Sequence, residues 1–523
     1  MPISSDFRRG TSSSSKSEPL GIWRWTVLAF ISLVAFGLRL FCLSCKPFWF
    51  DEAFSVEVSR VTWPNFLHLL WWREANMSLY YLVLRGWSLF GQSPFFVRSL
   101  SALMAAATIA VVYWLGTLLY DRRTGLIAAA LLAFNAYHIR YAQEARSYAL
   151  FALLGTLSSA FLVSFLQHPT DAKRRAYLLT SVLAVYAHFY ALLLIVAQWL
   201  ALLCVGNARN FDKTDAGGEA WFVNAKEIRK NWRIIAAGAA PVLIFVAKTG
   251  AGPIKWIKRP GISDLSRFIG NITNGWPIIY LGGCALAMFA AGRYMFRRRQ
   301  TWSEWRVQFL SIWLLFPVLL TMLLSFARPV FLPRYMIFCI PALMILTAAG
   351  IGSIRPIWLG AVVAVAVLLL SVRSVPFVYS HDFDSERDGS IAASGFILDH
   401  SLPNDAVVFH IAETRIPYEY VRSLRSGQNT ASPQFNGHLG PEIVFPNHGP
   451  GLNYRDFTGK PSPEFLRNEL PRYSNVWVML MNNGTLDKPD PTTVMLSEAL
   501  PQMFPRVQSW QFAKVELRLY GKQ

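Results

Sequence analysis

Long uncharged runs separated by short polar segments dominate the first 380 residues of this chain. The leading run covers residues 25–43, with Arg39 as its only charge. Because a helix needs about 20 apolar residues to cross a bilayer, the pattern predicts a polytopic α-helical membrane protein. The later runs cover residues 99–120, 124–139, 147–170, 176–208, 268–292, 307–327, 335–354 and 356–372.

The pattern changes after residue 380. Short apolar runs at residues 406–411 and 476–481 are bounded by Pro, Asn and Asp, which is typical of buried strands. Residues 515–520 alternate and predict an edge strand, while residues 390–400 and 419–426 have helical character. We therefore expect residues 381–523 to form a small soluble α/β domain, with no catalytic constellation of its own.

Composition supports the membrane class. The chain is 53% hydrophobic and 15% charged, whereas soluble domains are about 25% charged. Its net charge of +19 is concentrated in residues 1–380, which hold 37 Lys and Arg against 15 Asp and Glu, while residues 381–523 hold 13 against 16. The positive charge is scattered over loops rather than gathered on one face, so nucleic-acid binding is not predicted.

The basic clusters predict the topology. An excess of Lys and Arg marks the cytoplasmic side of short loops. All the clusters fall on one side if residues 176–208 form two short spans that turn at His188-Phe189-Tyr190. We expect about eleven spans in the inner (plasma) membrane, a disordered cytoplasmic lead at residues 1–20, and an exported C-terminal domain. The clusters lie at residues 8–24, 122–123, 173–175, 226–233, 293–306 and 355.

Two adjacent carboxylates follow the first span. Asp51 and Glu52 lie in the predicted first exported loop, residues 46–98, and ionisable groups at a membrane boundary are costly unless they have a function. Later in this loop, residues 79–87 combine apolar and aromatic side chains at helical spacing, which predicts a helix in the membrane interface.

Two further segments reach the same side. Residues 135–148 contain Arg140, Glu144 and Arg146, and residues 328–335 contain Arg334. Guanidinium groups suit phosphate oxygens, aromatic rings stack on sugars, and a carboxylate can take a proton from an attacking hydroxyl. Together these residue types predict transfer of a sugar from a lipid phosphate, within a transmembrane catalytic region of residues 21–380.

Four motifs carry a family resemblance. The order is Trp-Phe-Asp-Glu-Ala, then Leu-Tyr-Tyr-Leu, then Tyr-Ala-Gln-Glu-Ala-Arg-Ser-Tyr-Ala-Leu, and late in the chain Arg-Tyr-(x)5-Pro. It resembles the bacterial glycosyltransferase family 39 group, relatives of protein O-mannosyltransferases and lipid A aminoarabinose transferases with the GT-C fold. The match runs through roughly residues 20–350. The resemblance implies a polyprenyl-phosphate-linked sugar donor, inversion at the anomeric carbon, and Asp51 as the general base.

One motif departs from the group. Asn76-Met77-Ser78 stands where members commonly have His-Pro-Pro or Lys-Pro before the Leu-Tyr-Tyr element. The donor phosphate is therefore expected to contact Arg146, Arg140 or Arg334 instead. The acceptor is left open between a protein, a lipid and a polysaccharide.

Each carboxylate and arginine has an alternative role. Asp51 could instead cap the following helix, and Glu52 could pair with Arg60 rather than act in catalysis. Asp51 and Glu52 are also the candidate ligands of a divalent cation, Mg or Mn. Arg146 could pair with Glu144. The candidate contacts for sugar or lipid are Tyr80, Tyr81, Tyr141, His188 and Arg39, of which Arg39 is expected to face a cavity or a carboxylate.

Two alternatives concern the whole chain and its cysteines. Cys42 and Cys45 have redox or metal spacing, but without a second pair we interpret them as small apolar packing residues. A transporter or flippase for lipid-linked sugars is the alternative to a glycosyltransferase. Transporters tend to contain internal repeats, and the sequence shows no such duplication, so the enzyme is the preferred interpretation.

Overall fold

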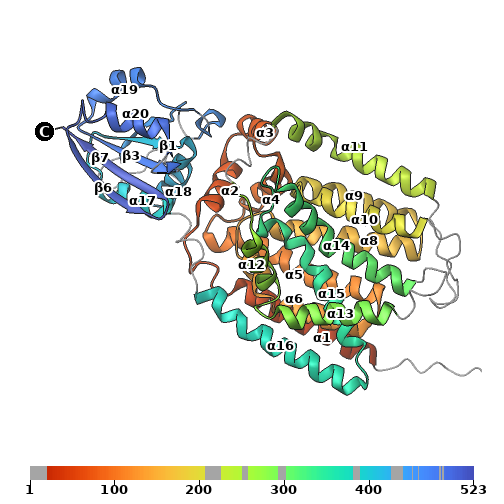
Figure 1. Cartoon of the computed structure of the whole chain (residues 1–523). Coiled ribbons are helices and arrows are strands. Elements are labelled where there is room, and N and C mark those ends of the chain that lie inside the picture. Colours follow the sequence, from red (N-terminus) through yellow and green to blue (C-terminus); the bar gives the residue numbers. More distant parts are fainter. Residues whose placement is uncertain are drawn as a thin grey trace, which may run out of the picture.

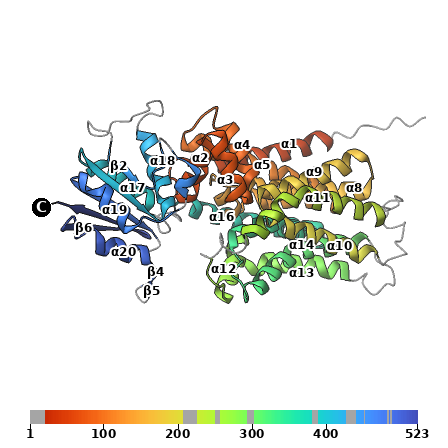
Figure 2. The same ribbon diagram turned by 90° about the horizontal axis from the view of Figure 1, so that it is seen from above.

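A helical bundle is followed by a smaller α/β region in the computed structural model of the chain (Figures 1 and 2). The α/β region lies at one end of the bundle, beside α2 and α3 of the first loop. The structure describes residues 20–206, 225–249, 257–292, 302–380, 389–425, 440–449, 452–457, 459–481, 484–485 and 488–522. The predicted lead, residues 1–20, therefore lies outside the described residues except for Leu20.

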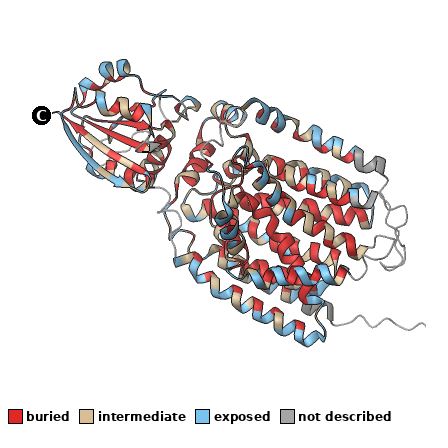
Figure 3. Ribbon diagram, viewed as in Figure 1, coloured by how far each residue is buried: buried red, intermediate tan, exposed pale blue. Residues whose placement is uncertain are grey.

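The bundle contains most of the helices. They are, in chain order, α1 Leu20–Leu40, α2 Phe50–Arg60, α3 Trp63–Trp72, η1 Ala75–Met77, α4 Ser78–Trp87, α5 Pro94–Leu119, α6 Arg122–Ala133, α7 Ala136–Ala142, α8 Tyr148–Gln167, α9 Asp171–Ala187, α10 Ala191–Gly206, α11 Ala225–Thr249, α12 Ile262–Ile272, α13 Pro277–Gly292, α14 Trp302–Leu324, η3 Pro333–Cys339, α15 Ile340–Gly352 and α16 Ile357–Ser380. Among these, α15 is enclosed by its neighbours, whereas α16 and α14 expose apolar side chains such as Leu369 and Leu323 (Figure 3). Such outward apolar faces suit a lipid environment.

Helix breaks interrupt three of the predicted runs. α9 and α10 are separated at residues 188–190, where the sequence predicted a turn. The run 124–139 is divided because the Asn135 side chain accepts a hydrogen bond from the main-chain N–H of His138 and so starts α7. The run 268–292 bends by 79° between α12 and α13, at Gly275, whose φ of +82° a non-glycine residue rarely adopts.

These breaks affect the count of spans. Within the described part of the chain, six helices are long and apolar enough to cross a membrane, or seven if the bent pair is one span. Shorter apolar helices cover Trp25–Leu40 and Ala191–Leu203. The multi-pass helical character is confirmed, but the count of eleven is not, because the short segments do not each reach the length of a full span.

The first loop forms its own helical layer. α4 coincides with the helix predicted at residues 79–87. Its tyrosines, Tyr80 and Tyr81, are buried, so they face the protein. It is α3 that presents large exposed rings, from Trp63 and Trp71.

The C-terminal region contains a five-stranded sheet in the order β2-β1-β3-β7-β6. The predicted strands at residues 406–411 and 476–481 are β1 and β3, which pair in parallel. The strand predicted at residues 515–520 is β7, but its predicted position at the edge of the sheet is wrong. β7 lies between β3 and β6, because the polar strand β6 pairs antiparallel with it. The elements are α17 Ser390–His400, β1 Asp405–His410, η4 Ala412–Thr414, α18 Arg415–Arg425, β2 Glu442–Phe445, η5 Tyr454–Phe457, α19 Pro463–Glu469, η6 Leu470–Arg472, β3 Asn475–Met481, β4 Gly484–Thr485, β5 Lys488–Pro489, α20 Pro491–Ala499, β6 Arg506–Phe512 and β7 Val515–Gly521.

The C-terminal region touches the first loop directly. α18 packs on α2, and the ring of Tyr420 stacks on Phe48 with 5.0 Å between centroids. Glu413 pairs with Arg73 at 2.7 Å. The region therefore helps to hold the loop that carries Asp51.

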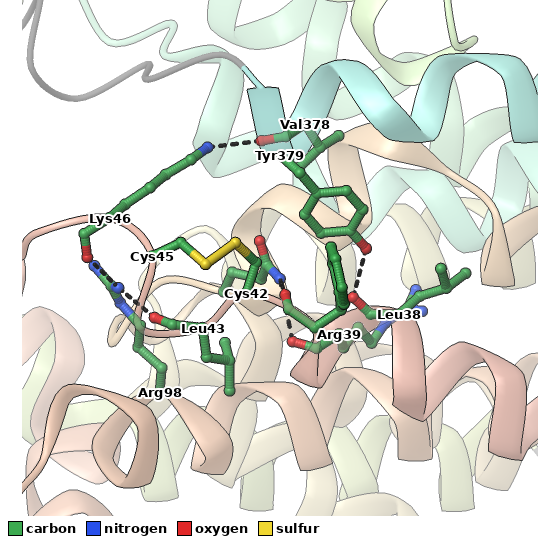
Figure 4. The surroundings of a disulfide bond; sticks show 11 residues. Leu38, Arg39, Cys42, Leu43, Cys45, Lys46, Arg98, Val378 and Tyr379 are labelled. Carbon is green, nitrogen blue, oxygen red and sulfur yellow. Dashed lines mark hydrogen bonds between the residues drawn. A yellow bond between two sulfur atoms is a disulfide. The ribbon is translucent and has the colours of Figure 1, made fainter.

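Cys42 and Cys45 form a disulfide bond in the turn that follows α1 (Figure 4). The interpretation of this pair as packing residues is therefore wrong. The turn brings their Cα atoms to 5.0 Å, within the range that a disulfide bond requires. Cys284 and Cys339 are free and buried, as expected of packing residues.

Reporter fusions would test the orientation of the bundle. A fusion after residue 217 is expected to report the cytoplasm, and one after residue 523 the outside, because basic loops stay in the cytoplasm. A phosphatase reporter and a fluorescent reporter at each position measure this. An outside signal after residue 217 would mean that α9 and α10 do not cross the membrane as two separate spans. The C-terminal region would then be expected in the cytoplasm.

Candidate active site

Asp51 lies between two arginines from distant parts of the chain. Its Oδ2 is 3.6 Å from Nη2 of Arg146 and 3.7 Å from Nη2 of Arg334. Arg146 lies in the segment between α7 and α8, and Arg334 is the second residue of η3. The three segments that the sequence placed on one side thus meet at one point. The N-cap of α2 is Trp49, so the alternative of Asp51 as the cap is wrong.

Arg146 is held by several groups of the first loop. Its Nη1 donates to the main-chain oxygen of Asp51 at 3.2 Å, to Oγ of Ser55 at 3.3 Å and to the hydroxyl oxygen of Tyr81 at 3.4 Å. Glu144 pairs instead with Arg140, at 3.8 Å. The guanidinium of Arg146 is therefore aimed at Asp51.

Glu74 is a site residue that sequence reasoning missed. The Tyr81 hydroxyl donates to its Oε2 at 3.1 Å, and burial raises the pKa of Glu74 above the ordinary value, with Arg146 acting in the opposite sense. The only signal in the sequence was a carboxylate two residues before Asn76. That asparagine has a structural role of its own, since its Oδ1 accepts from the main-chain N–H of Phe189 at 2.9 Å.

Aromatic rings lie beside the arginines. The Tyr335 ring centroid is 4.6 Å from that of His188, 5.1 Å from Tyr190 and 6.3 Å from Tyr148. His188, predicted as a sugar or lipid contact, thus belongs to this cluster, and Tyr141 adjoins it at 5.3 Å from Tyr148. Sequence reasoning did not assign Tyr190 or Tyr335, although it named His188 and Arg334 from the same two segments.

Glu52 points away from Asp51. It is fully buried and pairs with Arg98, with 2.6 Å between Oε2 and Nη2. Arg60 pairs with Glu57 at 2.7 Å, so the alternative of a Glu52–Arg60 pair is wrong. Among the described residues, no group of three or more His, Cys, Asp or Glu is placed to hold a metal ion, and the divalent cation stays a prediction.

Two other candidates lie apart from Asp51. The Arg39 guanidinium donates to the carbonyl oxygens of Leu132 and Ala133, at 3.2 Å each. The expectation of a carboxylate partner is wrong, because the guanidinium binds these carbonyls at the end of α6 and lies 2.9 Å from Nδ1 of His138. The Tyr80 hydroxyl lies 3.3 Å from Oγ of Ser101.

The charges around Asp51 favour an anionic ligand. Two guanidinium groups face a single carboxylate oxygen, and both arginine side chains are largely buried, with 8% and 15% exposed. Glu74 adds a second carboxylate near Arg146, and in a buried setting each guanidinium attracts the negative charge of a ligand strongly. The arrangement can bind a phosphate beside a proton acceptor.

The fold of the chain is similar to that of solved membrane proteins. No protein-family model and no curated protein sequence matches the chain. It is similar to the crystal structure of ArnT from Cupriavidus metallidurans in the apo state, with a TM-score of 0.58 and 14% identity over 97% of this chain and 100% of that chain. For the same protein bound to undecaprenyl phosphate the TM-score is 0.55, with 14% identity over 96% and 99%.

A more distant similarity is to the archaeal oligosaccharyltransferase AglB from Archaeoglobus fulgidus, in complex with an inhibitory peptide and a dolichol-phosphate. Its TM-score is 0.50, with 12% identity over 87% of this chain and 69% of that chain. At these identities the similarity defines the fold. The chain therefore has the GT-C fold of these membrane glycosyltransferases, as its sequence resemblance implied.

Proposed function

We propose that the protein is a membrane glycosyltransferase that moves a sugar from a polyprenyl-phosphate-linked donor to an acceptor hydroxyl, with inversion. The observation that carries the proposal is Asp51 held between Arg146 and Arg334, at 3.6 and 3.7 Å. The solved ArnT structure with undecaprenyl phosphate supports a donor of this class.

The arginines would bind the donor phosphate. Arg146 and Arg334 both direct a guanidinium nitrogen at the same carboxylate oxygen, so a phosphate beside Asp51 could contact both. Forked guanidinium groups bind phosphate oxygens in pairs and keep their charge. Arg140 is a weaker candidate, because it pairs with Glu144.

Asp51 would act as the general base. The acceptor hydroxyl loses its proton to the carboxylate while its oxygen attacks the anomeric carbon, and the lipid phosphate leaves with the electron pair of the broken bond. A single displacement of this kind inverts the anomeric centre. The rings of Tyr148, His188 and Tyr335 would line the sugar.

The site would lie on the exported face. The Cys42–Cys45 disulfide bond immediately precedes the loop of Asp51, and disulfide bonds persist in oxidising compartments. This supports a first loop of residues 46–98 outside the cytoplasm, followed by an exported domain of residues 381–523 that docks on it.

A deletion strain separates the enzyme from the transporter alternative. Without the transferase, the polyprenyl-phosphate sugar should accumulate in the outer leaflet, where membrane-impermeant periodate oxidises it in intact spheroplasts. Without a flippase, the same lipid should accumulate in the inner leaflet and resist the reagent until the cells are lysed. Lipid extracts analysed by mass spectrometry measure both. Unchanged lipid profiles together with inactive purified protein would contradict the proposal.

A further inference from the structure

Arg98, at the start of α5, has all five of its N–H groups bonded within the protein. Nε and Nη2 donate to the two carboxylate oxygens of Glu52 at 2.8 and 2.6 Å. Nη1 donates to the carbonyl oxygens of Leu43 at 2.6 Å and Lys46 at 2.8 Å, and Nη2 also reaches Pro47 O at 3.0 Å. Arginine offers five donors in a rigid fork, and here each has an acceptor.

Glu52 extends this network to the segment before Arg146. Its Oε1 also accepts a hydrogen bond from the main-chain N–H of Ala145 at 2.8 Å. Asp51 and Arg146 are the chain neighbours of these two residues. The Arg98–Glu52 pair therefore connects the start of α2 to the residue beside Arg146.

The disulfide bond restrains the third part of the network. Cys42 and Cys45 enclose Leu43, whose carbonyl is one acceptor of Arg98, and Lys46 follows directly (Figure 4). Closing this turn limits the positions that the two carbonyls can take. Arg98 and Glu52 are 4% and 0% exposed, and a buried pair of this kind becomes strongly unfavourable when one partner is removed.

We propose that Arg98 is a positioning residue, which acts through Glu52 to keep Asp51 and Arg146 at their observed separation. The Cys42–Cys45 disulfide bond supports Arg98 by ordering the carbonyl groups that accept its hydrogen bonds. This rests on the proposed function of Asp51 and Arg146. It also gives Glu52 a role as an internal support, with no contact to substrate.

Arg98→Met is the direct test, with two readouts. Amide hydrogen exchange of residues 143–148, measured without substrate, should become faster, because Ala145 loses a fixed acceptor. The kcat per folded molecule should fall by about 10²-fold, since small misplacements of reacting groups have effects of this size. Arg98→Lys should recover only part of both, because a point charge replaces the fork.

The control is Arg472→Met. Arg472 pairs with Glu442 at 3.3 Å, but both side chains are 58% exposed, so exchange at residues 143–148 and kcat should stay as in the unchanged protein. If Arg98→Met behaved like this control, the positioning role would be overturned. Should Arg98→Met fail to insert, Arg98→Lys carries the same comparison.

The disulfide bond is tested by Cys42→Ser combined with Cys45→Ser. Exchange at residues 143–148 should rise and kcat should fall, by less than in Arg98→Met. When the two cysteine substitutions are combined with Arg98→Met, their effects on exchange and kcat should be less than additive, because they act on one network. Fully additive effects would overturn the supporting role of the disulfide bond. Altered exchange in a protein without any transferase activity would reject the proposed function while supporting the network.

Discussion

Asp51→Asn is expected to lower the rate of sugar transfer by about 10²–10⁴-fold, because the amide keeps the shape of the carboxylate but cannot accept a proton. Asn should still contact Arg146 and Arg334, so the protein should insert and fold. With the negative charge removed from between two guanidinium groups, the donor phosphate should bind at least as well as before. The measurement is kcat and the donor KM with purified enzyme in lipid nanodiscs.

A matched control for this variant is Asp264→Asn. Asp264 also lies in the first turn of a helix, α12, where it pairs with the exposed Arg267 at 3.4 Å. Its amide variant should keep the turnover of the unchanged enzyme. Turnover of Asp51→Asn close to that of this control would exclude Asp51 as the base.

Arg146→Ala is expected to raise the KM for the donor by about 10–10²-fold and to leave the KM for the acceptor nearly unchanged. Hydrogen bonds to charged groups contribute about 1.5–3 kcal/mol, and a factor of ten corresponds to about 1.4 kcal/mol. The kcat should fall as well, because Arg146 also contacts the main chain of Asp51. Separate titration of the two substrates measures both constants.

Three arginine variants make this prediction specific. Arg146→Lys should recover donor binding only in part, because an ammonium group lacks the fork. Arg334→Ala should resemble Arg146→Ala, since both side chains face the same oxygen of Asp51. Arg140→Ala should have a much smaller effect on the donor KM. If Arg140→Ala instead had the larger effect, the phosphate site would belong beside Glu144.

The corrections have a common origin in contacts that the pattern of a single segment does not contain. Arg39 donates to carbonyls at the end of α6, 93 and 94 residues away in the chain. β7 is an inner strand because the polar strand β6 pairs with its free side. Cys42 and Cys45 are close in sequence, but their spacing does not distinguish a disulfide bond from packing until the turn after α1 is known.

The sequence by itself determined the class of the molecule and the residue types at its site. Apolar runs and the change after residue 380 are local properties, and they predicted the helices and the two central strands because periodicity and length depend on neighbouring residues only. Charge placement also predicted that Asp51, Arg146 and Arg334 lie on one side, since the membrane sorts whole segments by charge.

Only the tertiary structure decided which groups touch. Asp51 is shared by two arginines, Glu52 is turned away towards Arg98, and Glu74 joins through Tyr81. These contacts link positions up to 283 residues apart, as from Asp51 to Arg334. They depend on how whole helices pack and on which side of a helix each side chain leaves, and neither is contained in the pattern of any one segment.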